Sequence, residues 1–428
     1  MSVRKTIVGI LFGKVAQSVS RIALVPIIIA TLGPESYGEW LLYSSITAWV
    51  MMSNMGVGSL IANEMSLKYF SDDLNGARES YTYGLHICAG ILLVVGVISF
   101  VVVCGLHFAG FLDFTKAAAI VLLAVSVPVS FFAEVIGARL RLVNKNHIGG
   151  ILSGVRAWTE PLLTIIFLGI AKNIVSLALA VFLSAGIHVV LTFIIARLKE
   201  RSCHRKRLSP PFSTYIAIVR SGMGFMAFPL GNAIVFQGSL MVIAGVLGPM
   251  AVAVYGTTRT ATRVVNQLLE VLNQAIWPQL TMLYAEGRNL ELKQLWMRAT
   301  LISASTALFA AIAFAIWGPE LYRLWVRNSI EPNGSLFIIL AIGIPLGATW
   351  SSAGILLLAL NRQIIYGRLY FAGSVLFMVL AYMFSTELNL MGVALASCLF
   401  DGLMVGTTFI LVARFLKSEA VLSPQNLK

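Results

Sequence analysis

Long apolar stretches separated by short polar breaks run along the whole chain. Twelve can be distinguished, at approximately residues 8–31, 37–62, 83–106, 117–138, 148–170, 174–196, 216–246, 250–277, 298–318, 335–360, 364–385 and 389–413. A helix needs about 20 apolar residues to cross a bilayer. These stretches are long enough for that and too long for ordinary β-strands. The pattern therefore predicts an all-α polytopic membrane protein with 12 transmembrane helices.

Composition excludes several other classes of protein. Of the 428 residues, 58% are hydrophobic and only 11% are charged, whereas soluble domains carry about 25% charged residues. A soluble enzyme, a disordered regulator and a secreted disulfide scaffold are therefore excluded. The four cysteines, Cys88, Cys104, Cys203 and Cys398, show no metal-ligand spacing. We expect neither a disulfide framework nor a metal site.

The basic residues predict the orientation in the membrane. With the N-terminus placed in the cytoplasm, the inner segments hold 21 Lys and Arg, whereas the outer loops hold four: Lys116, Lys172, Arg323 and Arg327. Cytoplasmic loops of membrane proteins carry such an excess of Lys and Arg. Both termini are thus predicted to be cytoplasmic. The net charge of +13 follows mainly from this topology, and no nucleic-acid partner is expected.

The two halves of the chain share landmarks. Leu32-Gly33-Pro34 recurs 215 positions later as Leu247-Gly248-Pro249, and Asn144 recurs 217 positions later as Asn361 in similar contexts. A nearly constant offset indicates an internal repeat. Six spans per copy make the copies parallel, as in transporters built from two lobes. We predict an N-lobe at 1–196, a basic cytoplasmic linker at 197–215 and a C-lobe at 216–428.

Polar side chains along span eight form the principal candidate site. Arg259, Arg263, Asn266, Glu270 and Asn273 are spaced 4, 3, 4 and 3 residues apart, which places them on one helix face. The face is either a structural seam, in which carboxylates neutralise the arginines, or the lining of an aqueous cavity. Because two arginines face one carboxylate, the pattern favours a cavity with excess positive charge.

Span one and span twelve add further candidates. Lys14 and Arg21 share a face of span one, although Lys14 is close enough to the cytoplasmic end to extend its ammonium group to the interface. Asp401 lies deep in span twelve, where it is a candidate for ion coupling or a hydrogen-bonded structural residue. Guanidinium groups match phosphate oxygens and stay charged when desolvated. The charges therefore favour a transporter of an anionic ligand.

Two runs at span two resemble those of a known family. They are Leu32-Gly33-Pro34-Glu35-Ser36-Tyr37-Gly38-Glu39-Trp40 and Asn54-Met55-Gly56-Val57-Gly58-Ser59. With the 12-span duplicated layout, they resemble the Wzx-type O-antigen or polysaccharide flippases of the multidrug/oligosaccharidyl-lipid/polysaccharide (MOP) exporter superfamily. The chain departs from the family pattern at Asn54 and Asn63, where acidic and basic residues are common.

The resemblance implies a MATE-like fold of two six-helix lobes and a function in lipopolysaccharide or related polysaccharide biosynthesis. Such a protein flips an undecaprenyl-diphosphate-linked oligosaccharide from the cytoplasmic to the outer leaflet of the bacterial inner membrane. It works by alternating access with a cationic central cavity. Its expected partners are the lipid-linked oligosaccharide, membrane lipids, a polysaccharide polymerase and a chain-length regulator.

The resemblance also suggests roles for the candidate residues. The diphosphate would bind Lys14, Arg21, Arg259 and Arg263, and the sugars would bind Asn266, Gln267 and Asn273. No cofactor is expected, while coupling to H⁺ or Na⁺ through Glu270 or Asp401 stays open.

Two alternatives remain. A multidrug or metabolite exporter would share the fold, but cationic drugs call for an acidic cavity. A membrane-embedded glycan polymerase or ligase would be expected to have a large external loop with catalytic Arg or His, whereas only His107 falls in the predicted outer loops. We therefore do not expect an enzyme.

Overall fold

The computed structural model describes residues 19–20, 22–54, 56–143, 145–199, 226–360 and 363–422. Within these residues the regular structure is helical and contains no strand. Eight of the described helices are long and apolar enough to cross a membrane. The prediction of an all-α, multi-pass membrane protein is confirmed. The chain divides into two compact units, Met1–Met226 and Ala227–Lys428.

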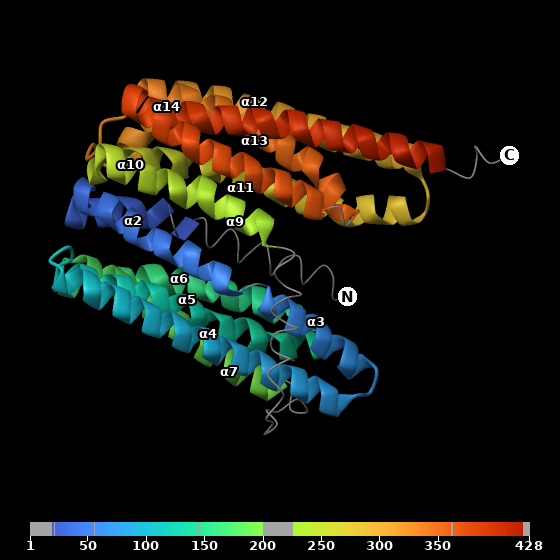
Figure 1. Cartoon of the computed structure of the whole chain (residues 1–428), viewed down its shortest axis with the longest axis horizontal. Coiled ribbons are helices and arrows are strands. Elements are labelled where there is room, and N and C mark those ends of the chain that lie inside the picture. The colour runs from blue at the N-terminus through green and yellow to red at the C-terminus, as the bar shows by residue number, and fades with distance from the viewer. Residues whose placement is uncertain are drawn as a thin grey trace. The chain divides into compact units, whose positions relative to one another are not determined.

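The first unit is a bundle of mostly long helices (Figure 1). A short apolar helix at Ile22–Leu32 precedes α2 (Pro34–Met51), α3 (Val57–Phe70), α4 (Leu74–Phe108), α5 (Phe114–Leu142), α6 (Asn146–Ile170) and α7 (Ile174–Lys199). The helix α5 packs against both α4 and α7. Ala119 and Leu123 of α5 and Ala178 of α7 belong to one fully buried cluster. Small residues of this kind let membrane helices approach closely.

The predicted span at 37–62 is wrong as one continuous helix. It is interrupted by a 3₁₀ turn at Met52–Asn54 and by Gly56, whose φ of +70° is left-handed. The side chain of Asn54 lies at this break, where its Nδ2 donates to Oε2 of Glu134 on α5 at 2.9 Å. Only a residue without Cβ fits at position 58, because the Glu134 carboxylate occupies that space. The 3₁₀ turn and the left-handed Gly56, which hydropathy does not detect, therefore separate α2 from α3.

The second unit contains α9 (Ala227–Ala233), a π-helical turn (Ile234–Gly238), α10 (Ser239–Leu247), α11 (Pro249–Ala285), α12 (Asn289–Trp325), α13 (Gly334–Ala359) and α14 (Gln363–Leu422). The π-helical turn interrupts predicted span seven. Predicted spans eleven and twelve both lie within α14, which kinks at Asn389, where φ is 55° and ψ is −136°. The segments of α14 before and after Asn389 are therefore two helices that run in different directions.

The Leu-Gly-Pro landmark has the same local structure in each unit. Gly33 precedes α2 with φ 86° and ψ 162°, and Gly248 precedes α11 with φ 84° and ψ 176°. Both backbones lie in a region that favours glycine. Pro34 and Pro249 then occupy the first helical position, where the missing N–H costs nothing. Two sequence copies thus begin their helices in the same way.

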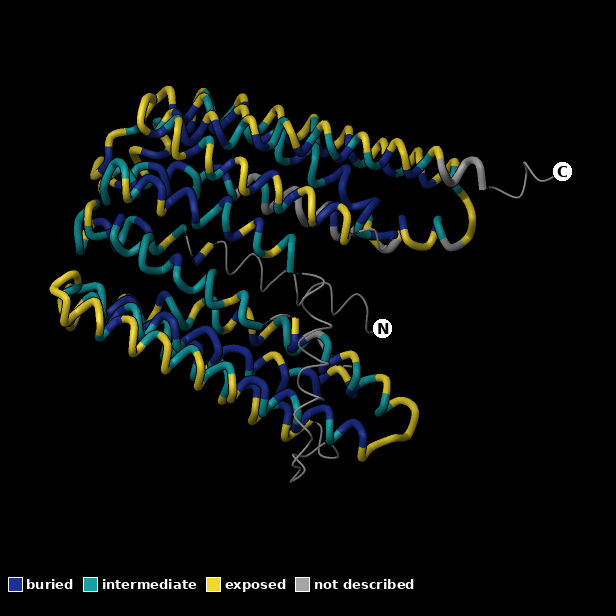
Figure 2. Tube along the Cα trace, viewed as in Figure 1, coloured by how far each residue is buried: buried dark blue, intermediate teal, exposed yellow. Residues whose placement is uncertain are grey.

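Exposed residues recur along one face of several helices (Figure 2), and many of them are large and apolar. On α4 the exposed residues include Leu93, Val97, Phe100 and Val101, each more than half exposed. A contiguous apolar surface of this kind is unfavourable in water and suits contact with lipid tails. The inward faces carry the small residues and the polar contacts.

Replacement of Gly84 should test the packing of the first unit. A Cβ at Gly84 would lie 2.8 Å from Cγ1 of Val135 and 2.9 Å from Cγ2 of Ile61. Gly84→Leu should therefore overpack the α3–α4–α5 contact and destabilise the protein by about 1–3 kcal/mol. Thermal unfolding of purified protein in detergent measures the loss. Gly90→Leu on the same helix is the control, because a Cβ there meets nothing within 4 Å. Equal stability of the two variants would contradict this packing.

Candidate functional site

The two arginines of α11 that the sequence singled out converge on one aromatic ring. The guanidinium carbon of Arg263 lies 4.4 Å from the ring centroid of Phe236, and that of Arg259 lies 5.4 Å from the same centroid. Arg259 also lies 5.3 Å from the ring of Tyr255. These are distances of cation–π contacts. The ring of Phe236 therefore keeps two positive charges close together.

The backbone around Phe236 explains how Arg259 is held. Phe236 lies in the π-helical turn Ile234–Gly238, a type of irregularity that is frequent at functional sites. Its carbonyl oxygen accepts a hydrogen bond from Nη1 of Arg259 at 2.9 Å. The hydroxyl of Ser239 accepts a second bond from the same nitrogen at 2.7 Å. Arg259 is thus fixed to the two preceding helical segments by two neutral acceptors and the ring of Phe236.

The charge of Arg259 is not balanced by any carboxylate among the described side chains, since the ion pairs found there involve other residues. A half-buried cation without such a partner is costly. The alternative of a neutralised seam depends on Glu270, whose side chain lies outside the described part of the structure. Arg263 makes a further interaction in addition to its ring contact.

The other predicted residues of α11 follow the arginines along the helix. Asn266 is half-buried, and its Oδ1 is buried without a hydrogen-bond partner among the side chains that the structure describes. Asn273 is buried, with 7% of its surface exposed. Gln267 lies on the same helix, but its side chain, like that of Glu270, falls outside the described residues. An amide oxygen that lacks a donor inside a protein is a place where a ligand hydroxyl could bind.

Asp401, on the second segment of α14, is held by a neighbouring helix. Its Oδ1 accepts a hydrogen bond from Nε1 of Trp350 on α13 at 2.8 Å. Gly343 and Gly347 of α13 face its carboxylate. The phenol of Tyr255 interacts electrostatically with both Arg259 and Asp401.

Not every predicted site residue can be placed. Lys14 and Arg21 of span one lie outside the described residues. Two contacts of Arg259, by contrast, were missed by sequence reasoning: Phe236 and Ser239 lie in an apolar run in which neither stands out. Their signal is the local change in helix type, which hydropathy does not reveal.

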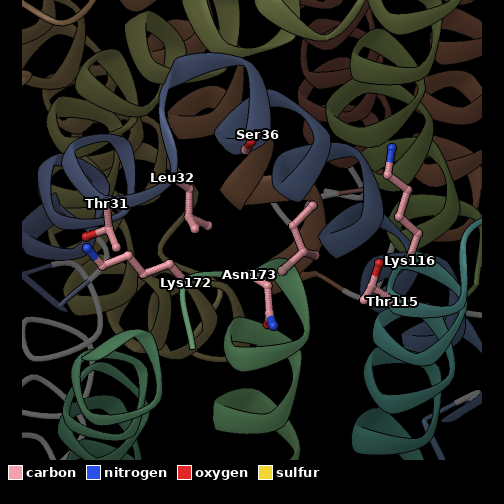
Figure 3. A pocket seen from close by; sticks show the side chains of 8 residues that line it. Thr31, Leu32, Ser36, Thr115, Lys116, Lys172 and Asn173 are labelled. Atoms are coloured by element: carbon pink, nitrogen blue, oxygen red, sulfur yellow. The ribbon is translucent and has the colours of Figure 1, made fainter. Parts of the chain in front are cut away.

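A second feature of the structure, a pocket of about 270 Å³, lies at the ends of helices in the first unit (Figure 3). It is lined by Thr31, Leu32, Ser36, Thr115, Lys116, Lys172, Asn173 and Ile174. The sequence analysis identified two of these residues, Lys116 and Lys172, only as basic residues of the predicted outer loops. Their segments are far apart in the sequence, so no linear motif joins them.

Comparisons of sequence find no relatives: no protein-family model matches the chain, and no curated protein is significantly similar to it. Solved structures are similar over nearly the whole chain. A multidrug resistance MATE family transporter of the MOP superfamily in its inward-facing conformation has a TM-score of 0.79, at 16% identity, covering 95% of this chain and 96% of that one. The outward-facing conformation of a transporter of that family has a TM-score of 0.69, at 15% identity, covering 98% and 96%.

A third structure is a MOP superfamily transporter from Pyrococcus furiosus, described by a reverse polarity of its binding pocket that suggests a different function. Its TM-score is 0.68, at 16% identity, covering 98% of this chain and 96% of that one. Identities this low establish the fold alone. The predicted fold class is confirmed: the chain has the MATE-like fold of MOP superfamily transporters.

Proposed function

We propose that this protein flips an undecaprenyl-diphosphate-linked oligosaccharide from the cytoplasmic to the outer leaflet by alternating access. The observation that carries the proposal is the pair of guanidinium groups of Arg259 and Arg263 on the ring of Phe236. The MATE-like fold supports membrane transport as the general activity. The charge of the pair supports an anionic ligand.

The geometry of the pair suits a diphosphate. Nη1 of Arg259 donates to Phe236 and Ser239, and Tyr255 also interacts with this guanidinium, so the group is held in place while its remaining N–H groups can donate to a ligand. Phosphate oxygens accept paired N–H donors from a planar guanidinium. Arg263 adds a second positive charge beside the same ring. In the proposal, Lys14 and Arg21 contribute further cations from span one.

The asparagines of α11 would bind the sugar part of the ligand. The unpartnered Oδ1 of Asn266 accepts a hydroxyl hydrogen, which sugars supply in abundance. Asn273 and Gln267 follow on the same helix. An oligosaccharide bound along α11 would then place its diphosphate toward the arginines and its hydroxyl groups toward these amides.

Coupling to an ion gradient belongs to the same proposal. The carboxylate of Asp401 is oriented by Trp350, so a proton or Na⁺ bound there would change the charge of this buried group. Glu270 is the other acidic candidate. The cell would supply a polysaccharide polymerase and a chain-length regulator as partners in the inner membrane.

A multidrug or metabolite exporter is the second candidate, because multidrug MATE transporters are among the structural neighbours. The neighbour described by reversed pocket polarity indicates that ligands differ within this fold. Cationic drugs would be repelled by Arg259 and Arg263. A glycan polymerase or ligase has less support, because the neighbours above are transporters.

The deciding experiment uses cells that lack the gene and measures on which leaflet the lipid-linked oligosaccharide accumulates. Accumulation on the cytoplasmic leaflet, relieved by the wild-type protein, is expected. Single repeat units on the outer leaflet would instead indicate a polymerase or ligase. Normal distribution of the lipid together with lost efflux of cationic dyes would indicate a drug exporter.

Removal of either guanidinium should reduce flipping in these cells. Arg259→Ala and Arg263→Ala each remove charge-assisted hydrogen bonds worth about 1.5–3 kcal/mol, so export should fall by about tenfold to a hundredfold. Arg263→Lys should give an intermediate value, because lysine keeps the charge and loses the planar fork. Arg368→Ala is the matched control, since Arg368 is an exposed arginine of the same unit. Full export by both alanine variants at normal protein levels would refute the phosphate-binding role.

Substitutions of Phe236 should distinguish the contribution of its aromatic ring to positioning the arginines from the contribution of its apolar packing. Phe236→Leu removes two cation–π contacts, worth about 0.5–2 kcal/mol each, and should lower apparent affinity for pyrophosphate by about fivefold or more. Phe236→Tyr keeps an aromatic face and should retain near wild-type affinity. Binding to purified protein is measured by titration with pyrophosphate. Equal losses in the two variants, or none in either, would show that the ring does not position the arginines.

A further inference from the structure

The polar pocket belongs to the first unit, whereas the α11 arginines belong to the second, and the pocket has no part in the transport proposed above. It is formed where α2, α5 and α7 begin, together with the end of the helix Ile22–Leu32 (Figure 3). We propose that this pocket binds a phosphate group, carried either by a membrane phospholipid headgroup or by free phosphate. The proposal does not depend on the identity of the transported substrate.

Two charged side chains line the pocket, and both are cations. Lys116 on α5 and Lys172 before α7 stand on opposite sides of the space in Figure 3, and none of the eight lining residues is acidic. Lys116 forms an ion pair with Glu39 at 2.8 Å, and Asp113 also interacts with it electrostatically. Lys172 is exposed and has no ion-pair partner among the described residues. Lys172 is therefore the cation whose charge a ligand would balance.

The remaining polar groups of the wall can donate hydrogen bonds to an anion. Hydroxyl groups come from Ser36 and Thr115, whereas the hydroxyl of Thr31 already donates to the carbonyl oxygen of Ile27 at 2.7 Å. The Oδ1 of Asn173 is already used as acceptor for the backbone N–H of Ser176 at 2.9 Å, so the amide has its Nδ2 group left to donate. A tetrahedral phosphate accepts several donors arranged around it. The pocket offers hydrogen-bond donors on several sides. It suits an anion better than an acyl chain, because few of its lining residues are apolar.

The starts of two helices add to the positive potential. Neither α2 nor α5 has a side chain that accepts from its first N–H groups, and these groups carry the partial positive charge of a helix N-terminus, which Glu35 in the first turn of α2 and Asp113 before α5 offset in part. Ser36 and Thr115, which line the pocket, are in the first turns of these helices. The lysines and hydroxyl groups define the site, and the helix ends strengthen it.

The position along the helices favours a headgroup phosphate. The pocket lies at the ends of α5 and α7 opposite to their basic ends at Arg141 and Lys199. Helices that cross the hydrocarbon core end at the level of the lipid headgroups. A phosphodiester at that depth would meet Lys172 without leaving the membrane surface.

The test uses the full-length protein, purified in a non-ionic detergent and stripped of lipid. Binding of three probes is measured separately by native mass spectrometry and by titration: phosphatidylglycerol, diacylglycerol and inorganic phosphate. Lys172→Met removes the charge and retains the length of the side chain, and Thr115→Val removes one hydroxyl at constant shape. Lys199→Met is the matched control, because Lys199 is an exposed lysine at the other end of α7. Thermal unfolding verifies that each variant is folded.

Phosphatidylglycerol should bind and diacylglycerol should not. Lys172→Met should weaken that binding by about tenfold or more, Thr115→Val should weaken it less, and Lys199→Met should leave it unchanged. Competition by inorganic phosphate with the same dependence on Lys172 would identify free phosphate as the ligand, and failure to compete would identify the headgroup. Equal binding of phosphatidylglycerol and phosphate by wild type and Lys172→Met, or no binding of either, would overturn the proposal.

Discussion

The hydrogen bonds that hold Arg259 are the constraint on which the second unit depends. A guanidinium placed among apolar helices must have its N–H groups satisfied. Here Nη1 donates to the carbonyl of Phe236 and to the hydroxyl of Ser239. The acceptors are neutral, so the positive charge is held in position without being cancelled by them. This is the arrangement that a binding site for an anion requires, and one that an ion pair would defeat.

Irregular backbone lies close to polar side chains in both units. The π-helical turn at Ile234–Gly238 supplies the acceptor for Arg259, and the 3₁₀ turn at Met52–Asn54 supplies the amide that donates to Glu134. In transporters, non-helical backbone at membrane depth is tolerated where it is buried in protein or lines a cavity. Breaks in these helices therefore mark the places where polar chemistry has been built into an apolar bundle.

The two proposed phosphate sites use different cations. The arginines of α11 have planar, desolvated guanidinium groups fixed against a ring, which suits a ligand that must be held and then released inside the protein. The lysines of the first-unit pocket are at helix ends, and Lys172 is exposed there. Lysine is a flexible point charge, which suits a headgroup in the interface. Arginine is thus used for the ligand proposed to bind inside the protein, and lysine for the ligand proposed to bind at the membrane interface.

The sequence by itself determined the helical class, the membrane environment and the polar face of span eight, because hydropathy and a period of 3.6 residues are local properties of the chain. It also located the shared Leu-Gly-Pro start of α2 and α11. Only the tertiary structure decided that Phe236 and Ser239 hold Arg259, that Asn54 meets Glu134, and that Lys116 and Lys172 line one pocket. Those contacts join residues on different helices, and helix packing, which no local pattern encodes, brings them together.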